Sequence, residues 1–167
     1  MSTLNYRVGT KNDLHSIMAL AMQSWKRYKN DLTEENWVRL NEILTSPTVF
    51  VELLNSSYPI LCETTDKQIV GMAFLVPSGN PTEIYQNNWS YIRFVSVHPS
   101  FGGQGIGKTL TKQCIAYAKS KKEKIVALHT SEMMQNAIVI YEKLGFKVLR
   151  PLAPSLGKKY WLYILEI

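Results

Sequence analysis

The sequence predicts an α/β (α+β) fold built on a single sheet. Segments of strand character and segments of helical period follow one another in the order β-α-α-β-β-β-α-β-α-β-β. The chain has 167 residues, a length typical of one domain, which we place at residues 1–167. Hydrophobic residues make up 46% of it, enough to build one core and to exclude a disordered chain.

The first half of the chain predicts a short strand, two helices and a hairpin. Asn12 and Asp13 can cap the first helix, and Thr33 begins the second, which Pro47 is expected to stop. A polar turn at residues 65–68 separates two apolar runs and indicates an antiparallel hairpin. The expected elements are a strand at 6–8, helices through 14–28 and from 33 to 46, and strands at 60–64 and 69–76.

The second half predicts strands that alternate with helices. A glycine-rich turn opens a helix with Ile106, Leu110 and Cys114 on one stripe, and Gly145 suits the C-cap of the next helix. A loop at 77–88 precedes a strand that Pro99 ends. The expected elements are strands at 89–97, 125–128, 146–149 and 160–165, and helices from 106 and through 134–144.

Composition narrows the classes of function and the compartment. The net charge is +6, but no aromatic residues are interleaved with the basic run at 119–124, so we expect no nucleic-acid partner. No apolar run approaches the ~20 residues of a membrane span, and the N-terminus lacks a secretory signal, so we expect no membrane association. Two cysteines without a CxxC pair indicate a reducing compartment, the cytoplasm.

The glycine-rich turn at residues 102–109 matches two motifs. Gly102-Gly-Gln-Gly-Ile-Gly-Lys-Thr109 satisfies the formula of the nucleotide P-loop, which would make the chain a nucleotide hydrolase. That chemistry needs an acid near the metal, and no aspartate follows Lys108, so we expect no metal. The other interpretation is a turn that binds a pyrophosphate on backbone N–H groups at a helix N-terminus.

Two motifs together resemble those of the GCN5-related N-acetyltransferase (GNAT) family. Residues 94–99, Phe-Val-Ser-Val-His-Pro, followed by the glycine turn, resemble its strand and pyrophosphate loop. Residues 128–146, with Ala137 and Tyr141 before Gly-Phe, resemble its second motif. The resemblance covers about residues 91–146. It implies the GNAT-like acyl-CoA N-acyltransferase fold, a mixed, mostly antiparallel sheet of about six to seven strands flanked by about four helices.

The resemblance implies direct transfer of an acetyl group from acetyl-CoA to a primary amine of a small molecule, amino acid or peptide. Tyr141 would be the general acid for the departing thiolate, and His129 a candidate general base beside Glu132, Glu83 or water. Main-chain N–H groups of Val95 and Val97 on a bulged strand would stabilise the oxyanion. The residues expected to bind acetyl-CoA are Val95, Ser96, Val97, Gly102, Gly103, Gln104, Gly105, Ile106, Gly107, Lys108, Thr109, Met134, Ala137 and Tyr141.

The chain departs from the family pattern at two positions and leaves the acceptor open. Gly102 stands where the family has Gln or Arg, and Met134 where it often has Asn. Aromatic residues are expected to wall the acceptor pocket: Trp25, Tyr28, Tyr85, Trp89 and Tyr91. Dimers are common in the family, so a homodimer is one assembly that the resemblance implies. A non-catalytic protein of the same fold that binds coenzyme A is the alternative function.

Overall fold

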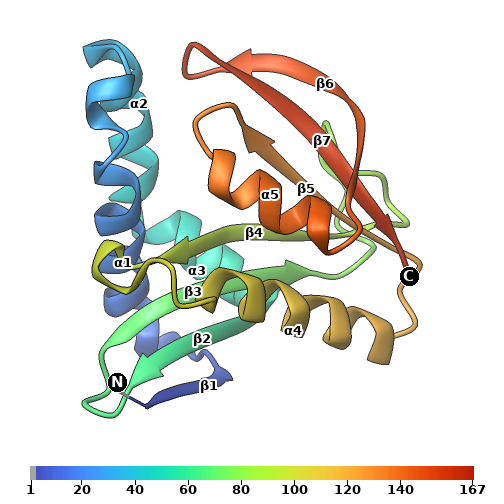
Figure 1. Cartoon of the computed structure of the whole chain (residues 1–167), viewed down its shortest axis with the longest axis horizontal. Coiled ribbons are helices and arrows are strands. Elements are labelled where there is room, and N and C mark those ends of the chain that lie inside the picture. Colours follow the sequence, from blue (N-terminus) through green and yellow to red (C-terminus); the bar gives the residue numbers. More distant parts are fainter. Residues whose placement is uncertain (1–2) are drawn as a thin grey trace.

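One seven-stranded sheet runs through the molecule in the order β1-β2-β3-β4-β5-β7-β6 (Figure 1). The computed structural model describes residues 3–167. Neighbouring strands are antiparallel except for the parallel pair β4 and β5, so the predicted mixed, mostly antiparallel sheet is confirmed. The strands are β1 (Leu4–Val8), β2 (Tyr58–Thr64), β3 (Ile69–Val76), β4 (Ser90–Val97), β5 (Ile125–Ser131), β6 (Lys147–Ser155) and β7 (Lys158–Glu166).

Five α-helices accompany the sheet within residues 3–167, one more than expected. Pro47 does not simply stop a helix: it occupies the first turn of a further one, where a missing N–H is harmless and its fixed φ suits the helix. Thr33 caps its helix as predicted by accepting a hydrogen bond from the N–H of Asn36. The helices are α1 (Leu14–Lys26), α2 (Glu34–Leu44), α3 (Pro47–Ser56), α4 (Ile106–Ser120) and α5 (Gln135–Lys143).

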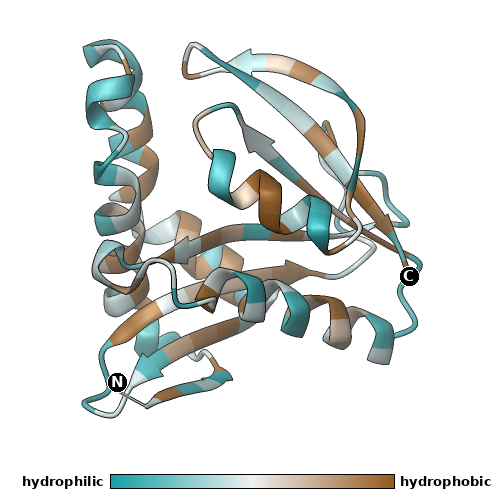
Figure 2. Ribbon diagram, in the orientation of Figure 1, coloured by the Kyte–Doolittle hydropathy of each residue, from teal (hydrophilic) through white to brown (hydrophobic). Residues whose placement is uncertain are grey.

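The two faces of the sheet carry separate apolar clusters. Helices α1, α2 and α3 cover one face, where Phe50 and Phe74 are fully buried, and α4 and α5 cover the other around Leu110. Figure 2 shows the corresponding apolar colour along the central strands. No helix in residues 3–167 is both long and apolar enough to cross a bilayer. Cys62 and Cys114 are both buried with free thiols.

A glycine in the centre of the sheet lets α4 approach closely. A Cβ atom on Gly71 of β3 would lie 2.6 Å from Cγ2 of Ile106 and 3.1 Å from Cδ1 of Leu110. Such distances are far below van der Waals contact between carbons. The side chain of Ile106 therefore anchors the first turn of α4 on the sheet, and the glycine-rich turn before it is held in place.

The sheet divides between β4 and β5. Only Ser90 and Tyr91 pair with β5, opposite Val126 and Ala127, after which the two parallel strands part. On its other edge β4 has a β-bulge, because the residues between Arg93 and Ser96 outnumber those of β3 opposite them. The bulge contains Phe94 at φ 51°. It lies on the strand for which the resemblance implied one, and its residues lack regular partners in the ladder.

A buried carboxylate connects β1 with β2. Glu63 accepts hydrogen bonds from Nε of Arg7 at 2.8 Å and from Nζ of Lys67 at 3.0 Å, and Arg7 also pairs with Asp13 at 2.8 Å. The hydrogen bond from Arg7 is the main reason why the pKa of Glu63 is lowered to about 2.

We therefore expect an acid-sensitive fold at this edge. A carboxylate whose pKa is lowered on folding stabilises the fold above its unfolded pKa, near 4.3, and loses that contribution as the pH falls towards 2. Glu63→Gln should be less stable than the wild type at pH 7 and should lose less stability between pH 5 and pH 2. Urea unfolding across this range tests the expectation, with the exposed Glu52→Gln as control. Parallel pH curves for Glu63→Gln and the wild type would contradict it.

Candidate active site

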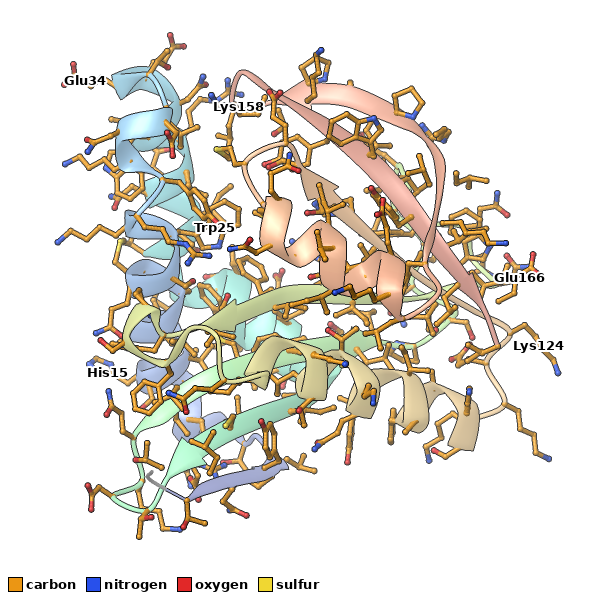
Figure 3. All side chains as sticks on the ribbon, in the orientation of Figure 1. His15, Trp25, Glu34, Lys124, Lys158 and Glu166 are labelled. Carbon is orange, nitrogen blue, oxygen red and sulfur yellow. The ribbon has the colours of Figure 1, made fainter. Side chains whose placement is uncertain are left out.

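Two cavities meet where the sheet divides. The larger has a volume of about 480 Å³ and the smaller about 270 Å³. They share four lining residues, which come from α1, β4, the start of α5 and its last turn: Trp25, Val95, Met134 and Tyr141. Figure 3 shows Trp25 between the α1–α2 pair and α5. The parting of β4 from β5 thus creates a junction that side chains close to only a few residues across.

The larger cavity lies mainly on the face covered by α1, α2 and α3. Its walls come from α2, from the bulge of β4, from β5 and from the β6–β7 hairpin, whose tip carries Leu156 at φ 53°. The walls are mostly apolar. Their polar side chains include Arg93, Glu83 and His129.

The smaller cavity lies towards the start of α5. Its walls are the end of α1, residues 95–97 of β4 and residues 133–137. Of the predicted site residues, it brings together Ser96, Val97 and Ala137 with the four that line both cavities. Asn136, which is out of register with the family position, also lies on its lining. This cavity adjoins the strand that leads into the glycine-rich turn.

Tyr141 is held at the junction by the way its helix ends. Gly145, at φ 100°, lets the chain reverse so that the N–H of Phe146 donates to the carbonyl of Tyr141 and that of Gly145 to Glu142, both at 3.0 Å. This is a Schellman cap and confirms the predicted role of Gly145. Burial raises the pKa of the Tyr141 phenol, which is therefore protonated at neutral pH. The side chain is buried, yet it lines both cavities.

His129 lines the larger cavity from β5. Its Nδ1 lies 2.5 Å from the hydroxyl of Tyr85, whose ring stacks on Tyr91 with centroids 4.0 Å apart. Burial, aided by the positive charge of Arg93, lowers the pKa of His129 to about 4. The ring is therefore neutral at pH 7 and a much weaker base than a free histidine, whose pKa is about 6.5.

The predicted aromatic wall is only partly where it was expected. Trp25 lines both cavities, and Tyr28 lines the smaller one. Tyr85, Trp89 and Tyr91 are instead buried in the apolar cluster beneath the larger cavity, without a place on its lining. The loop at 77–88 folds its aromatic rings inwards because their apolar area is better stabilised in the core than in an open pocket. Tyr85 contacts the cavity only through His129.

The glycine-rich turn has the shape of an anion site. Gly103 and Gly105 adopt positive φ, 75° and 77°, and Gly105 is the N-cap of α4. The first helical hydrogen bond runs from Thr109 to the carbonyl of Gly105, and no N–H of residues 103–108 donates to an acceptor within the described chain. A Cβ on Gly103 or Gly105 would meet no atom within 4 Å. Unused donors at a helix N-terminus, without side chains over them, are suited to a phosphate group.

The remaining predicted residues of the turn have different surroundings. The side chain of Ile106 belongs to the core, so only its main chain is available. Lys108 and Gln104 are exposed, and Gly107 is followed by the half-buried Thr109. Met134 precedes α5, where Thr130 Oγ1 lies 3.5 Å from its sulfur. Several lining residues were not anticipated, because they come together only through the packing of separate elements: Ser24, Arg27, Arg93, Phe94, Leu152 and Leu156.

The divided sheet with its anion site defines a class that solved acetyltransferases share. The PaiA N-acetyltransferase of Thermoplasma acidophilum, solved in complex with coenzyme A, superimposes with a TM-score of 0.79 at 18% identity and covers 99% of both chains. The model of the acetyltransferase (GNAT) family matches residues 14–146, and the chain belongs to that family. The resemblance to the GNAT family is thereby confirmed.

Two curated relatives match at lower coverage. An uncharacterized N-acetyltransferase of Methanocaldococcus jannaschii is 26% identical over 151 residues, which are 88% of this chain and 62% of the relative. N-acetyltransferase 8F1 of Mus musculus is 26% identical over 128 residues, 77% of this chain and 53% of the relative. The chain thus spans less than two thirds of the length of either relative.

The P-loop interpretation does not fit this architecture. Nucleotide hydrolases of that class build a parallel sheet around the loop, whereas here only β4 and β5 run parallel, over two residue pairs. The strand β5, where a metal-binding aspartate would be sought, ends in Thr130 and Ser131. The glycine-rich turn therefore belongs to the other interpretation, an anion site that needs no metal.

Proposed function

We propose that this chain transfers an acetyl group from acetyl-CoA directly to a primary amine of a small molecule, amino acid or peptide. One observation carries the proposal: the Tyr141 side chain lies where two cavities meet, and one of them follows β4 towards an anion site. The alternative, a protein that binds coenzyme A without catalysis, gives no reason for a protonated phenol at that junction.

The residues of the turn and the smaller cavity fit coenzyme A. The N–H groups of residues 103–108 would bind the pyrophosphate, and the exposed Lys108 would add a positive charge. The loss of a side-chain contact at Gly102 leaves these donors intact. Residues 95–97 with Met134 and Ala137 would line the path of the pantetheine arm. When bound, acetyl-CoA supplies the acetyl group as an activated thioester.

Residues of the chain would act at three points of the reaction. The bulge frees main-chain donors around Val95, whose N–H would stabilise the oxyanion. The hydroxyl of Tyr141 would give its proton to the leaving thiolate, and its raised pKa keeps that proton in place until then. His129, with a pKa of about 4, is poorly suited as general base. We therefore propose that the acceptor amine loses its proton to water, and that His129 shapes the cavity.

Thermal unfolding with ligands tests this proposal. Acetyl-CoA at 100 times its Kd should stabilise the fold by about 2.7 kcal/mol, whereas ATP with Mg²⁺ should not. Release of free thiol from acetyl-CoA should then accelerate with members of a library of primary amines. Stabilisation by ATP and Mg²⁺ alone would overturn the proposal. Binding of acetyl-CoA without thiol release for any amine would favour the non-catalytic alternative.

A further inference from the structure

Arg93 is an unpaired cation on the lining of the larger cavity. It is half-buried on β4, and no other lysine or arginine of the described chain contributes to that lining. The ion pairs within residues 3–167 join Arg7 and Lys67 to the carboxylates of β2 and the first turn, and none involves Arg93. Its recorded partner is the ring of the adjacent Phe94, 5.3 Å from the guanidinium carbon.

The surroundings of Arg93 do not neutralise its charge. Its charge contributes to lower pKa values for Tyr85, Tyr91 and His129, which places all three near the guanidinium. Burial raises the pKa of both phenols, so they stay uncharged, and His129 is neutral. Glu83 lies at the exposed rim and forms no ion pair with it. A half-buried guanidinium without a counter-ion is costly, and a ligand carboxylate would match its fork of donors.

The remainder of the cavity sets the size and polarity of the ligand. A volume of about 480 Å³ suits a small molecule. Leu40, Ile84, Leu152 and Leu156 supply apolar walls on several sides. A ligand that places a carboxylate at Arg93 therefore has an apolar remainder to bury against these side chains.

We propose that the acceptor is an amine that also carries a carboxylate, an α-amino acid with an apolar side chain, and that Arg93 binds its carboxylate. This inference rests on the proposed function, because the cavity must hold the acceptor. It also agrees with the chemistry, since a nearby positive charge favours the neutral form of an amine. Arg93 would thus be a residue that determines specificity.

Paired acceptors test this assignment. Leucine and 3-methylbutylamine, or phenylalanine and 2-phenylethylamine, differ only by the carboxylate. We expect kcat/KM for thiol release to be at least about tenfold higher for the amino acid of each pair, as a charged hydrogen bond is lost without it. Arg93→Gln should remove most of that preference, Arg93→Lys should retain part of it, and the exposed Arg39→Gln should leave it unchanged. Equal use of both members, or an equal loss on both in Arg93→Gln, would overturn the proposal.

Equilibrium binding separates this inference from acetyl transfer itself. Calorimetry with leucine and the protein loaded with coenzyme A should show binding that Arg93→Gln weakens at least about tenfold. Binding that depends on Arg93 without thiol release would support carboxylate recognition and overturn acetyl transfer. Thiol release with amines, but no binding of leucine or phenylalanine, would overturn carboxylate recognition and leave acetyl transfer standing.

Discussion

Tyr141→Phe should lower kcat by about 10²–10⁴-fold, the range over which a positioned general acid acts. Only the hydroxyl is removed, so the ring still fills its place between α5 and β4. Affinity for acetyl-CoA should change little, because the anion site lies on another element. Thiol release at saturating acetyl-CoA measures the first quantity, and the ligand-induced shift of the unfolding temperature measures the second.

The control for this variant is Tyr117→Phe. Tyr117 stacks on Tyr58 at the outer side of α4, with ring centroids 3.6 Å apart, and lines neither cavity. Its turnover should equal that of the wild type. Should Tyr141→Phe retain full turnover as well, the thiolate would leave without the phenol, and the assignment of Tyr141 as general acid would be wrong.

Gly105→Ala should weaken binding of acetyl-CoA strongly, by at least about tenfold, because it acts on the anion site in two ways. A residue with a Cβ is disfavoured at φ 77° by roughly 1–2 kcal/mol, so the turn is pushed towards another conformation. The added methyl group also occupies the open space in front of the unused N–H groups. Titration with acetyl-CoA measures the loss of affinity.

Gly79→Ala separates strain from binding. Gly79 has a comparable φ of 93° and equally open surroundings, but it lies in the loop between β3 and β4. The two variants should lose similar stability, while only Gly105→Ala should lose affinity for acetyl-CoA. An unchanged affinity in Gly105→Ala would remove the turn from the cofactor site.

Much of the fold is predictable because its signals are local. The glycine turn, the Gly145 cap and the hairpin of β2 and β3 each depend on residues adjacent in the chain. Pro47 misled the analysis, since a proline can end one helix and begin the next within three residues.

The candidate site was harder to predict than the fold. Tyr141 and the turn belong to contiguous motifs, whereas Arg93 acquires its meaning only when β5 parts from β4 and leaves it facing a cavity. The aromatic loop shows the same limit in reverse. Composition indicates that Tyr85 and Tyr91 have large apolar rings, but tertiary packing decides that they lie beneath the cavity.

The shared border of the two cavities has a consequence for inhibitor design. A single compound in which coenzyme A is tethered through its sulfur to the nitrogen of an amine would occupy both spaces at once, passing between Val95 and Tyr141. Because its two halves are joined, it would lose translational and rotational freedom once where separate ligands lose it twice, and its affinity would exceed that of either fragment.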